Sequence, residues 1–150
     1  MISSGTIFQY WVALLAGFVV AGLALLVAQD LDAVASTATL PAAGVGVAGA
    51  LVIELLLTAV FVAVILNVTK SAQYQGSVCA ATSLTLVAVH LAAATVSGAS
   101  VNPGRTLGSA IIGAEFSDGW NYIVGPMAGA ALGWVLYRLV TAGEVDNPLD

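Results

Sequence analysis

Charged residues are scarce in this sequence. Lysine, arginine, aspartate and glutamate make up 7% of its 150 residues, whereas a typical soluble domain carries about a quarter. Hydrophobic residues make up 60%, and the mean hydropathy is +1.04. A chain of this size cannot bury so much apolar surface in water, so the composition excludes a soluble globular domain. It predicts one membrane domain that covers residues 1–150.

Cysteine and basic residues are nearly absent as well. The one cysteine, Cys79, excludes an intrachain disulfide. The single histidine, His90, has no second histidine and no cysteine pair that could hold a metal with it, so we expect no metal and no other cofactor. Three basic residues against eight acidic ones give a net charge of −5, which argues against nucleic acid and anionic lipid as partners.

Long apolar runs fill most of the chain. Four of them can cross about 30 Å of hydrocarbon, namely residues 6–28, 47–68, 77–96 and 120–140. A fifth segment, residues 102–113, is too short to cross, but it begins like a helix, with Asn102 as the cap and Pro103 at the first helical position. We predict an all-α membrane fold with four transmembrane helices. The short helix either lies on the surface or is re-entrant, with its ends buried in protein or facing water.

The few basic residues predict the orientation. Lys70 follows the second span and Arg138 ends the fourth, so four spans place both on the side of the N-terminus. The positive-inside rule makes this side cytoplasmic. We therefore expect a protein of the plasma or inner membrane with both termini in the cytoplasm. Trp120 and Tyr122 at one end of the last span, and Trp134 at the other, are typical of interfacial anchors.

Three polar residues within apolar segments are candidates for function. Arg105 lies in the first turn of the short helix, where the helix dipole and the membrane both disfavour a cation; it faces either a water-filled passage or a surface loop. His90 lies fifteen residues earlier and either lines the same vestibule or is a core residue. Glu54 is the only carboxylate inside a span. A buried acceptor for loop N–H groups explains it better than a cation site or a proton relay.

Glycines on the last span indicate close helix packing. Gly125, Gly129 and Gly133 recur at every fourth residue and form one ridge along a helix. Small residues at this spacing let helix backbones approach each other in lipid. We expect this ridge to contact a neighbouring helix.

Enzymatic function is not expected. Ser97 and Ser100 lie near His90 in the sequence, and a serine hydrolase uses serine and histidine in its catalytic site. However, the sequence contains no G-x-S-x-G motif, and no acidic residue is placed to orient the histidine. Serine next to glycine and alanine is also common where helices end.

The stretch HLAAATVSGASVNPGRTLGSA, residues 90–110, resembles the second-half signature of the aquaporins, the major intrinsic protein family. In that family an Asn-Pro-Ala tripeptide heads a re-entrant half-helix, and an arginine follows it directly. A histidine on the preceding span and a small residue six positions before the arginine complete this part of the selectivity filter. The matching positions here are His90, Ala99, Asn102, Pro103, Gly104 and Arg105.

The resemblance extends over the other spans. VIELLLTAVFVAVIL resembles the fourth aquaporin span, whose glutamate braces the re-entrant loop and maps to Glu54. VGPMAGAALGWVLY resembles the sixth span, and QYWVALLAGFVVAGLALLVA the third. The family's first two spans, its first half-helix and the aromatic filter residue of the second span have no counterpart. Gly104 replaces the usual alanine, and Ser109 stands where the family often has proline.

The resemblance implies a channel for water or a very small neutral solute. Thr106 and His90 are similar to the water-selective branch, because glycerol-conducting members have aspartate after the arginine and glycine in place of the histidine. The family's pore needs two half-helices, so the resemblance implies a homo-oligomer, such as a tetramer, or a separate chain that supplies the first half. Two alternatives remain open: a non-conducting membrane scaffold subunit, and a small anion channel that uses Arg105 as its binding charge.

Overall fold

The computed structural model describes residues 39–70 and 75–142, together with the isolated helical positions Leu15, Val19, Leu23, Leu26 and Val27. Apart from these positions, the predicted span over residues 6–28 lies outside the described residues. Every regular element in the described ranges is a helix. The prediction of an all-α fold is confirmed for this part of the chain.

Four helices follow one another in the described ranges. Their bounds are α3 Gly46–Thr69, α4 Gln75–Ala93, α5 Pro103–Gly113 and α6 Asn121–Thr141. By length and composition, α3, α4 and α6 can each cross a membrane, whereas α5 is too short. The main difference from the predicted ranges is in α4, which ends at Ala93 rather than at residue 96, because the chain turns there.

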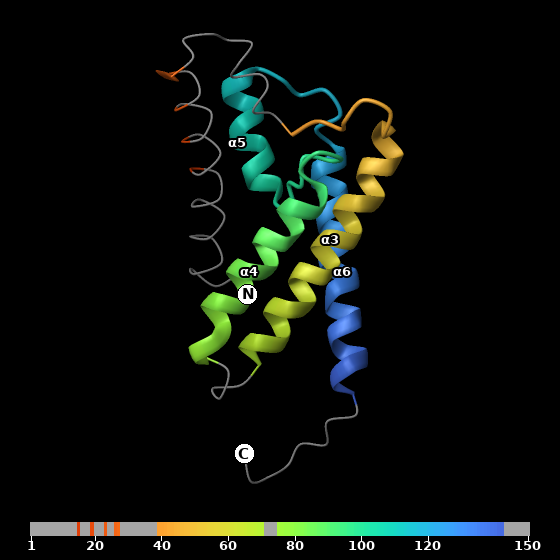
Figure 1. The fold of residues 1–150 in the computed structure, drawn as a ribbon. Helices are drawn as coiled ribbons and strands as arrows, with labels where there is room; N and C mark the ends of the chain where they lie inside the picture. The colour runs from red at the N-terminus through yellow and green to blue at the C-terminus, as the bar shows by residue number, and fades with distance from the viewer. Residues whose placement is uncertain are drawn as a thin grey trace, which may run out of the picture.

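The helices form a bundle in which α3 contacts both α4 and α6 (Figure 1). α3 and α6 begin at the same end of the bundle, and α4 runs in the opposite direction (Figure 1). After α4 the chain doubles back, and α5 begins well inside the bundle and runs to the end at which α6 begins (Figure 1). The segment made of the loop after α4 and α5 therefore enters and leaves the bundle at the same end.

The glycine ridge of α6 lies against α3. Gly125, Gly129 and Gly133 are all buried. A Cβ atom at Gly129 would lie 2.4 Å from the carbonyl oxygen of Leu55, and one at Gly133 would lie 2.5 Å from that of Ala59. Real Cβ atoms do not approach other heavy atoms so closely. The distance between α3 and α6 therefore depends on the absence of side chains at these positions.

Candidate functional site

Glu54 is the buried acceptor at the centre of the candidate site. It has no exposed surface, and its carboxylate accepts three hydrogen bonds from the loop that joins α4 to α5. Oε1 accepts from the Ser97 hydroxyl at 2.8 Å and from the Ser100 N–H at 2.9 Å. Oε2 accepts from the Val101 N–H at 2.7 Å. A buried N–H left without an acceptor costs about 1–3 kcal/mol. The carboxylate supplies the hydrogen-bond acceptors that lipid cannot offer to the loop.

The backbone of this loop is unusual. Gly98, Ala99 and Val101 have φ angles of +81°, +44° and +43°. Left-handed conformations suit glycine but cost other residues about 1–2 kcal/mol each, and they are rare for a β-branched residue. Such a backbone persists where its surroundings fix it. Here the hydrogen bonds to Glu54 do so.

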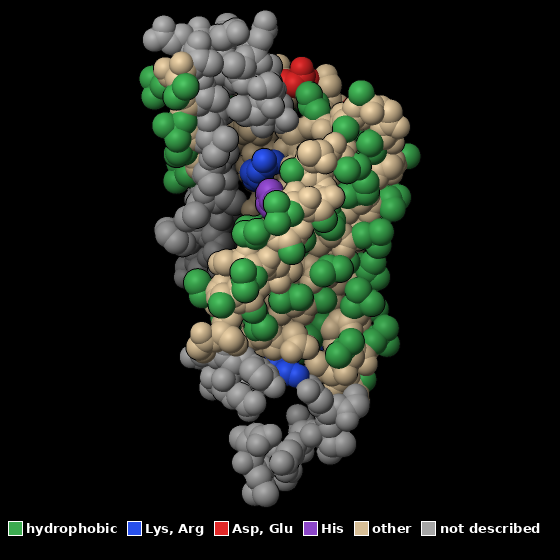
Figure 2. Space-filling model, in the orientation of Figure 1, with side chains coloured by type: hydrophobic (Ala, Val, Ile, Leu, Met, Phe, Trp, Pro, Cys, Tyr) green, Lys and Arg blue, Asp and Glu red, His purple; other side chains and the backbone are tan. Residues whose placement is uncertain are grey.

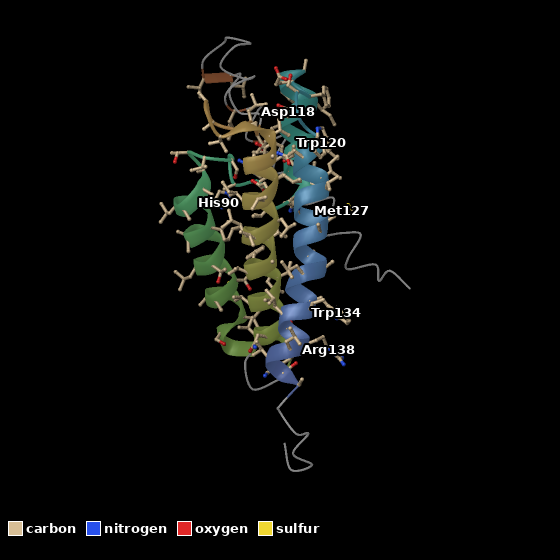
Figure 3. The ribbon with its side chains drawn as sticks, turned by 90° about the vertical axis from the view of Figure 1, so that its right-hand side faces the viewer. His90, Asp118, Trp120, Met127, Trp134 and Arg138 are labelled. Carbon is tan, nitrogen blue, oxygen red and sulfur yellow. The ribbon has the colours of Figure 1, made fainter. Side chains whose placement is uncertain are left out.

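Tyr122 supports the same loop from α6. Its hydroxyl donates to the carbonyl oxygen of Ser97 at 2.7 Å, and the residue has no exposed surface. The expectation that Tyr122 is an interfacial anchor is therefore wrong, because its hydroxyl finds a buried carbonyl instead of water. Trp120, just before α6, and Trp134, in the second half of α6, are by contrast more than half exposed (Figure 3).

Asn102 caps the end of α5 that lies inside the bundle. Its Oδ1 accepts from the N–H groups of Gly104 at 2.9 Å and Arg105 at 3.3 Å, while its carbonyl accepts from the Thr106 N–H at 3.2 Å. Pro103 occupies the first helical position and has no N–H that would need an acceptor. The first donors of α5 are thus satisfied within the chain, which a helix that begins at membrane depth requires.

We expect Asn102→Ala to lower the free energy of unfolding by about 1 kcal/mol, because it removes the acceptor of two helix N–H groups. Asn102→Ser is the matched control, since serine caps helices about as well as asparagine does. Chemical denaturation of the purified protein in detergent measures both variants. Equal losses for alanine and serine would show that the cap does not stabilise α5.

Arg105 lies half-buried in the first turn of α5. Its Nη1 donates to the hydroxyl of Thr39 at 2.8 Å, and the hydroxyl of Thr106 donates to the same oxygen at 3.4 Å. Thr39 belongs to the irregular segment before α3. A hydrogen bond from the Ala42 N–H to the Val96 carbonyl at 2.9 Å joins this segment to the loop. The guanidinium is therefore held by a residue remote in sequence.

His90 lies near the end of α4 (Figure 3). Its Nδ1 is 2.9 Å from the carbonyl oxygen of Leu86, which can only accept, so Nδ1 carries a hydrogen and Nε2 is the acceptor of the neutral ring. Figure 2 shows this histidine, the only one in the chain, next to a basic side chain. Of the three basic residues, Lys70 and Arg138 lie at the ends of α3 and α6, and Arg105 lies in the first turn of α5.

The structure thus brings most of the predicted filter residues to one place, with one difference among them. Asn102, Pro103, Gly104 and Arg105 are all partly exposed, as is His90. The predicted filter residue Ala99 has no exposed surface, and its N–H donates to the Ser97 hydroxyl at 3.2 Å. Its side chain therefore meets protein atoms rather than an open space.

Comparison with known proteins gives the family. The family model described as Major intrinsic protein matches residues 1–137. The chain belongs to the major intrinsic protein family. This confirms the resemblance on which the sequence-based prediction rests. Together with the three helices in the described ranges that are long and apolar enough to cross a membrane, it makes the chain an integral membrane protein.

The relatives of this major intrinsic protein carry aquaporin names. Aquaporin NIP1-4 of Oryza sativa subsp. japonica is 41% identical over 104 residues, which are 69% of this chain and 37% of that protein. Probable aquaporin TIP2-2 of Arabidopsis thaliana is 34% identical over 141 residues, 91% of this chain and 55% of that protein. Aquaporin-4 of Rattus norvegicus is 37% identical over 78 residues, 52% of this chain and 24% of that protein. The chain spans at most about half the length of these relatives.

Two residues of the site in this major intrinsic protein were not predicted from the sequence. Thr39 holds the Arg105 side chain, and Tyr122 holds the loop. Thr39 stands in an irregular segment without a motif, so no local signal marks it. Tyr122 could have been found from its phenol group, which needs a partner wherever it is buried.

Proposed function

We propose that this chain is an aquaporin-like channel subunit that passes water or a very small neutral solute across the membrane. The observation that carries the proposal is the start of α5 inside the bundle. There a capped helix N-terminus, a guanidinium and an imidazole come together on one partly exposed face. Membrane-embedded polar groups of this kind line water-filled cavities rather than lipid.

The polar groups of this face can replace the hydration shell of a neutral solute. The Oδ1 of Asn102 is occupied by α5, so its amide N–H groups remain as donors. Arg105 has further N–H donors beyond the one bound to Thr39, and Nε2 of His90 is an acceptor. Pro103 and Gly104, which are both partly exposed, complete the lining.

Charge favours neutral solutes over cations. The positive end of the α5 dipole and the guanidinium of Arg105 lie together, so a proton or a metal cation meets repulsion. Exclusion of cations by an arginine and by half-helix dipoles is an established property of aquaporin-type pores. Glu54 contributes as the brace of the loop, because all three of its hydrogen bonds are accepted from loop groups.

The proposed passage requires a partner surface within the lipid membrane. Among the described residues, α5 is the only short helix that begins inside the bundle. We propose that further copies, as in a homo-oligomer such as a tetramer, or a separate chain supply the opposing half. Lys70 and Arg138 favour a plasma or inner membrane with both termini in the cytoplasm. The subunit would act as a channel and not as an enzyme.

Osmotic shrinkage of liposomes that contain only the purified chain tests the proposal. We expect stopped-flow shrinkage faster than that of empty liposomes, and Arg105→Trp should return it to the empty-liposome rate by filling the passage. Arg138→Trp is the matched control, because Arg138 lies exposed in the last turn of α6 and 5.9 Å from the ring of Trp134. Liposomes that contain Arg138→Trp should shrink as fast as liposomes that contain the wild type.

Other results would favour the alternatives. Shrinkage equal to that of empty liposomes would contradict a pore built from this chain alone, and would leave a separate first half or a scaffold role. A current that follows the chloride gradient would favour the anion channel, since Arg105 would then act as a binding charge.

A further inference from the structure

Three hydroxyl groups connect Arg105 to the loop that Glu54 holds. Thr39 accepts from Arg105 Nη1 at 2.8 Å and from the Thr106 hydroxyl at 3.4 Å. The hydroxyls of Thr106 and Ser100 are in turn hydrogen-bonded to each other. The N–H of Ser100 donates to Glu54 at 2.9 Å. A continuous set of polar contacts thus runs from the brace to the guanidinium.

Burial makes these contacts hard to replace. Thr39 is 5% exposed, Thr106 3% and Ser100 1%. Where no water can enter, a hydrogen bond from a charged donor has no substitute if its acceptor is removed. The Thr39 hydroxyl is therefore the buried acceptor that holds Nη1 of the partly exposed Arg105.

The position of Thr39 is itself fixed. A hydrogen bond of 2.9 Å from the Ala42 N–H to the Val96 carbonyl joins its segment to the loop. Gly98 leaves room for its methyl group, because a Cβ at that glycine would lie 2.7 Å from Thr39 Cγ2. The φ of +81° at Gly98 also suits glycine alone. The loop therefore fixes the position of the Thr39 side chain.

We infer that Thr39 is a positioning residue for Arg105. With Thr106 it fixes the guanidinium at the proposed passage, and so determines which neutral solutes pass. This inference rests on the proposed function. An arginine tied to Thr39 keeps one position and one set of free donors, whereas a released arginine can swing aside and widen the passage. The segment before α3 is then part of the selectivity filter through a side chain that acts on the arginine.

Transport selectivity gives the first test. Thr39→Val removes the hydroxyl and keeps the shape, and we expect it to raise the urea-to-water permeability ratio of reconstituted protein by about tenfold, the effect of one lost hydrogen bond to a charged group. Thr39→Ser restores the acceptor and should return the ratio to that of the wild type. The double variant Thr39→Val with Arg105→Ala should match Arg105→Ala alone. A further increase in the double variant would overturn a role through the arginine.

Nuclear magnetic resonance gives a second test that needs no transport. The chain has two arginines, Arg105 and Arg138, so ¹⁵N-arginine labelling and an Arg138→Lys variant assign the Arg105 signals. A held guanidinium gives separate Nη signals, which we expect in the wild type and in Thr39→Ser. They should merge in Thr39→Val, and Thr106→Val should broaden them.

The two tests distinguish a failure of the proposed transport function from a failure of the positioning role of Thr39. Separate Nη signals in both valine variants would overturn the positioning role, whatever the liposomes show. Liposomes without water transport would contradict the proposed function, and the Nη signals would still decide whether Thr39 holds the arginine.

Discussion

Replacing Glu54 by glutamine is expected to lower the free energy of unfolding by about 3 kcal/mol, since it disrupts hydrogen bonds between a buried carboxylate and its donors. Every partner of this carboxylate is a donor: the hydroxyl of Ser97 and the N–H groups of Ser100 and Val101. Glutamine keeps one oxygen but turns its amide N–H groups toward a donor. At least one buried N–H or hydroxyl is then left without an acceptor. The strained loop also loses the contact that fixes it.

Glu115→Gln is the matched control for this prediction. Glu115 lies in the connection between α5 and α6, and hydrogen bonds from the Ser117 side chain and N–H lower the pKa of its carboxyl. It is therefore ionised at neutral pH, like an ordinary surface acid. Its substitution should leave the free energy of unfolding nearly unchanged. Denaturation in detergent at neutral pH compares the two.

Transport separates the brace role from a direct role in conduction. If Glu54 acts by holding the loop, the folded fraction of Glu54→Gln should keep the water selectivity of the wild type. Full stability together with altered selectivity would contradict the brace and favour the cation-site or relay interpretation of this carboxylate.

Local physics explains why much of the fold could be predicted. Apolar runs of membrane length set the bounds of α3 and α6 to within one residue of the predicted spans, at Gly46–Thr69 and Asn121–Thr141. Asn102 and Pro103 mark the start of α5 because a cap and a first-turn proline act within one turn of a helix. These signals need no knowledge of the rest of the chain.

The end of α4 could not be predicted in this way. Residues 94–96 are as apolar as the helix before them, so composition extends the helix to residue 96. The structure ends it at Ala93 and turns the chain so that Ser97 reaches Glu54, which is 43 positions away in sequence. A contact between residues so far apart in sequence gives no signal in the residues near the end of α4.

The same reason applies to the residues around Arg105. Thr39 lies 66 positions before the arginine that it holds, in a stretch of small residues without periodicity. The arginine itself was conspicuous, because a cation in an apolar segment needs an explanation. Sequence thus marks the residue that requires a partner, whereas only the fold identifies which of several hydroxyl groups provides it.

Replacing Gly129 by alanine is expected to destabilise the bundle by up to about 3 kcal/mol, the cost of overpacking a tight contact. The added Cβ would lie 2.4 Å from the carbonyl oxygen of Leu55 and 2.8 Å from Cβ of Thr58. The first of these neighbours is α3 backbone, which cannot rotate away as a flexible side chain can. The two helices must therefore move apart, although glycine-to-alanine changes inside helices usually stabilise by about 0.5–1 kcal/mol.

Gly76→Ala provides the control, because it makes the same change in α4 where a Cβ would meet nothing within 4 Å. It should leave the free energy of unfolding unchanged or raise it slightly, whereas Gly129→Ala should lower it. Denaturation in detergent measures both. If Gly129→Ala also stabilises the protein, the contact between α3 and α6 is not limited by the ridge. The loop would then owe its place to Glu54 and Tyr122 rather than to the fixed spacing of the helices that carry them.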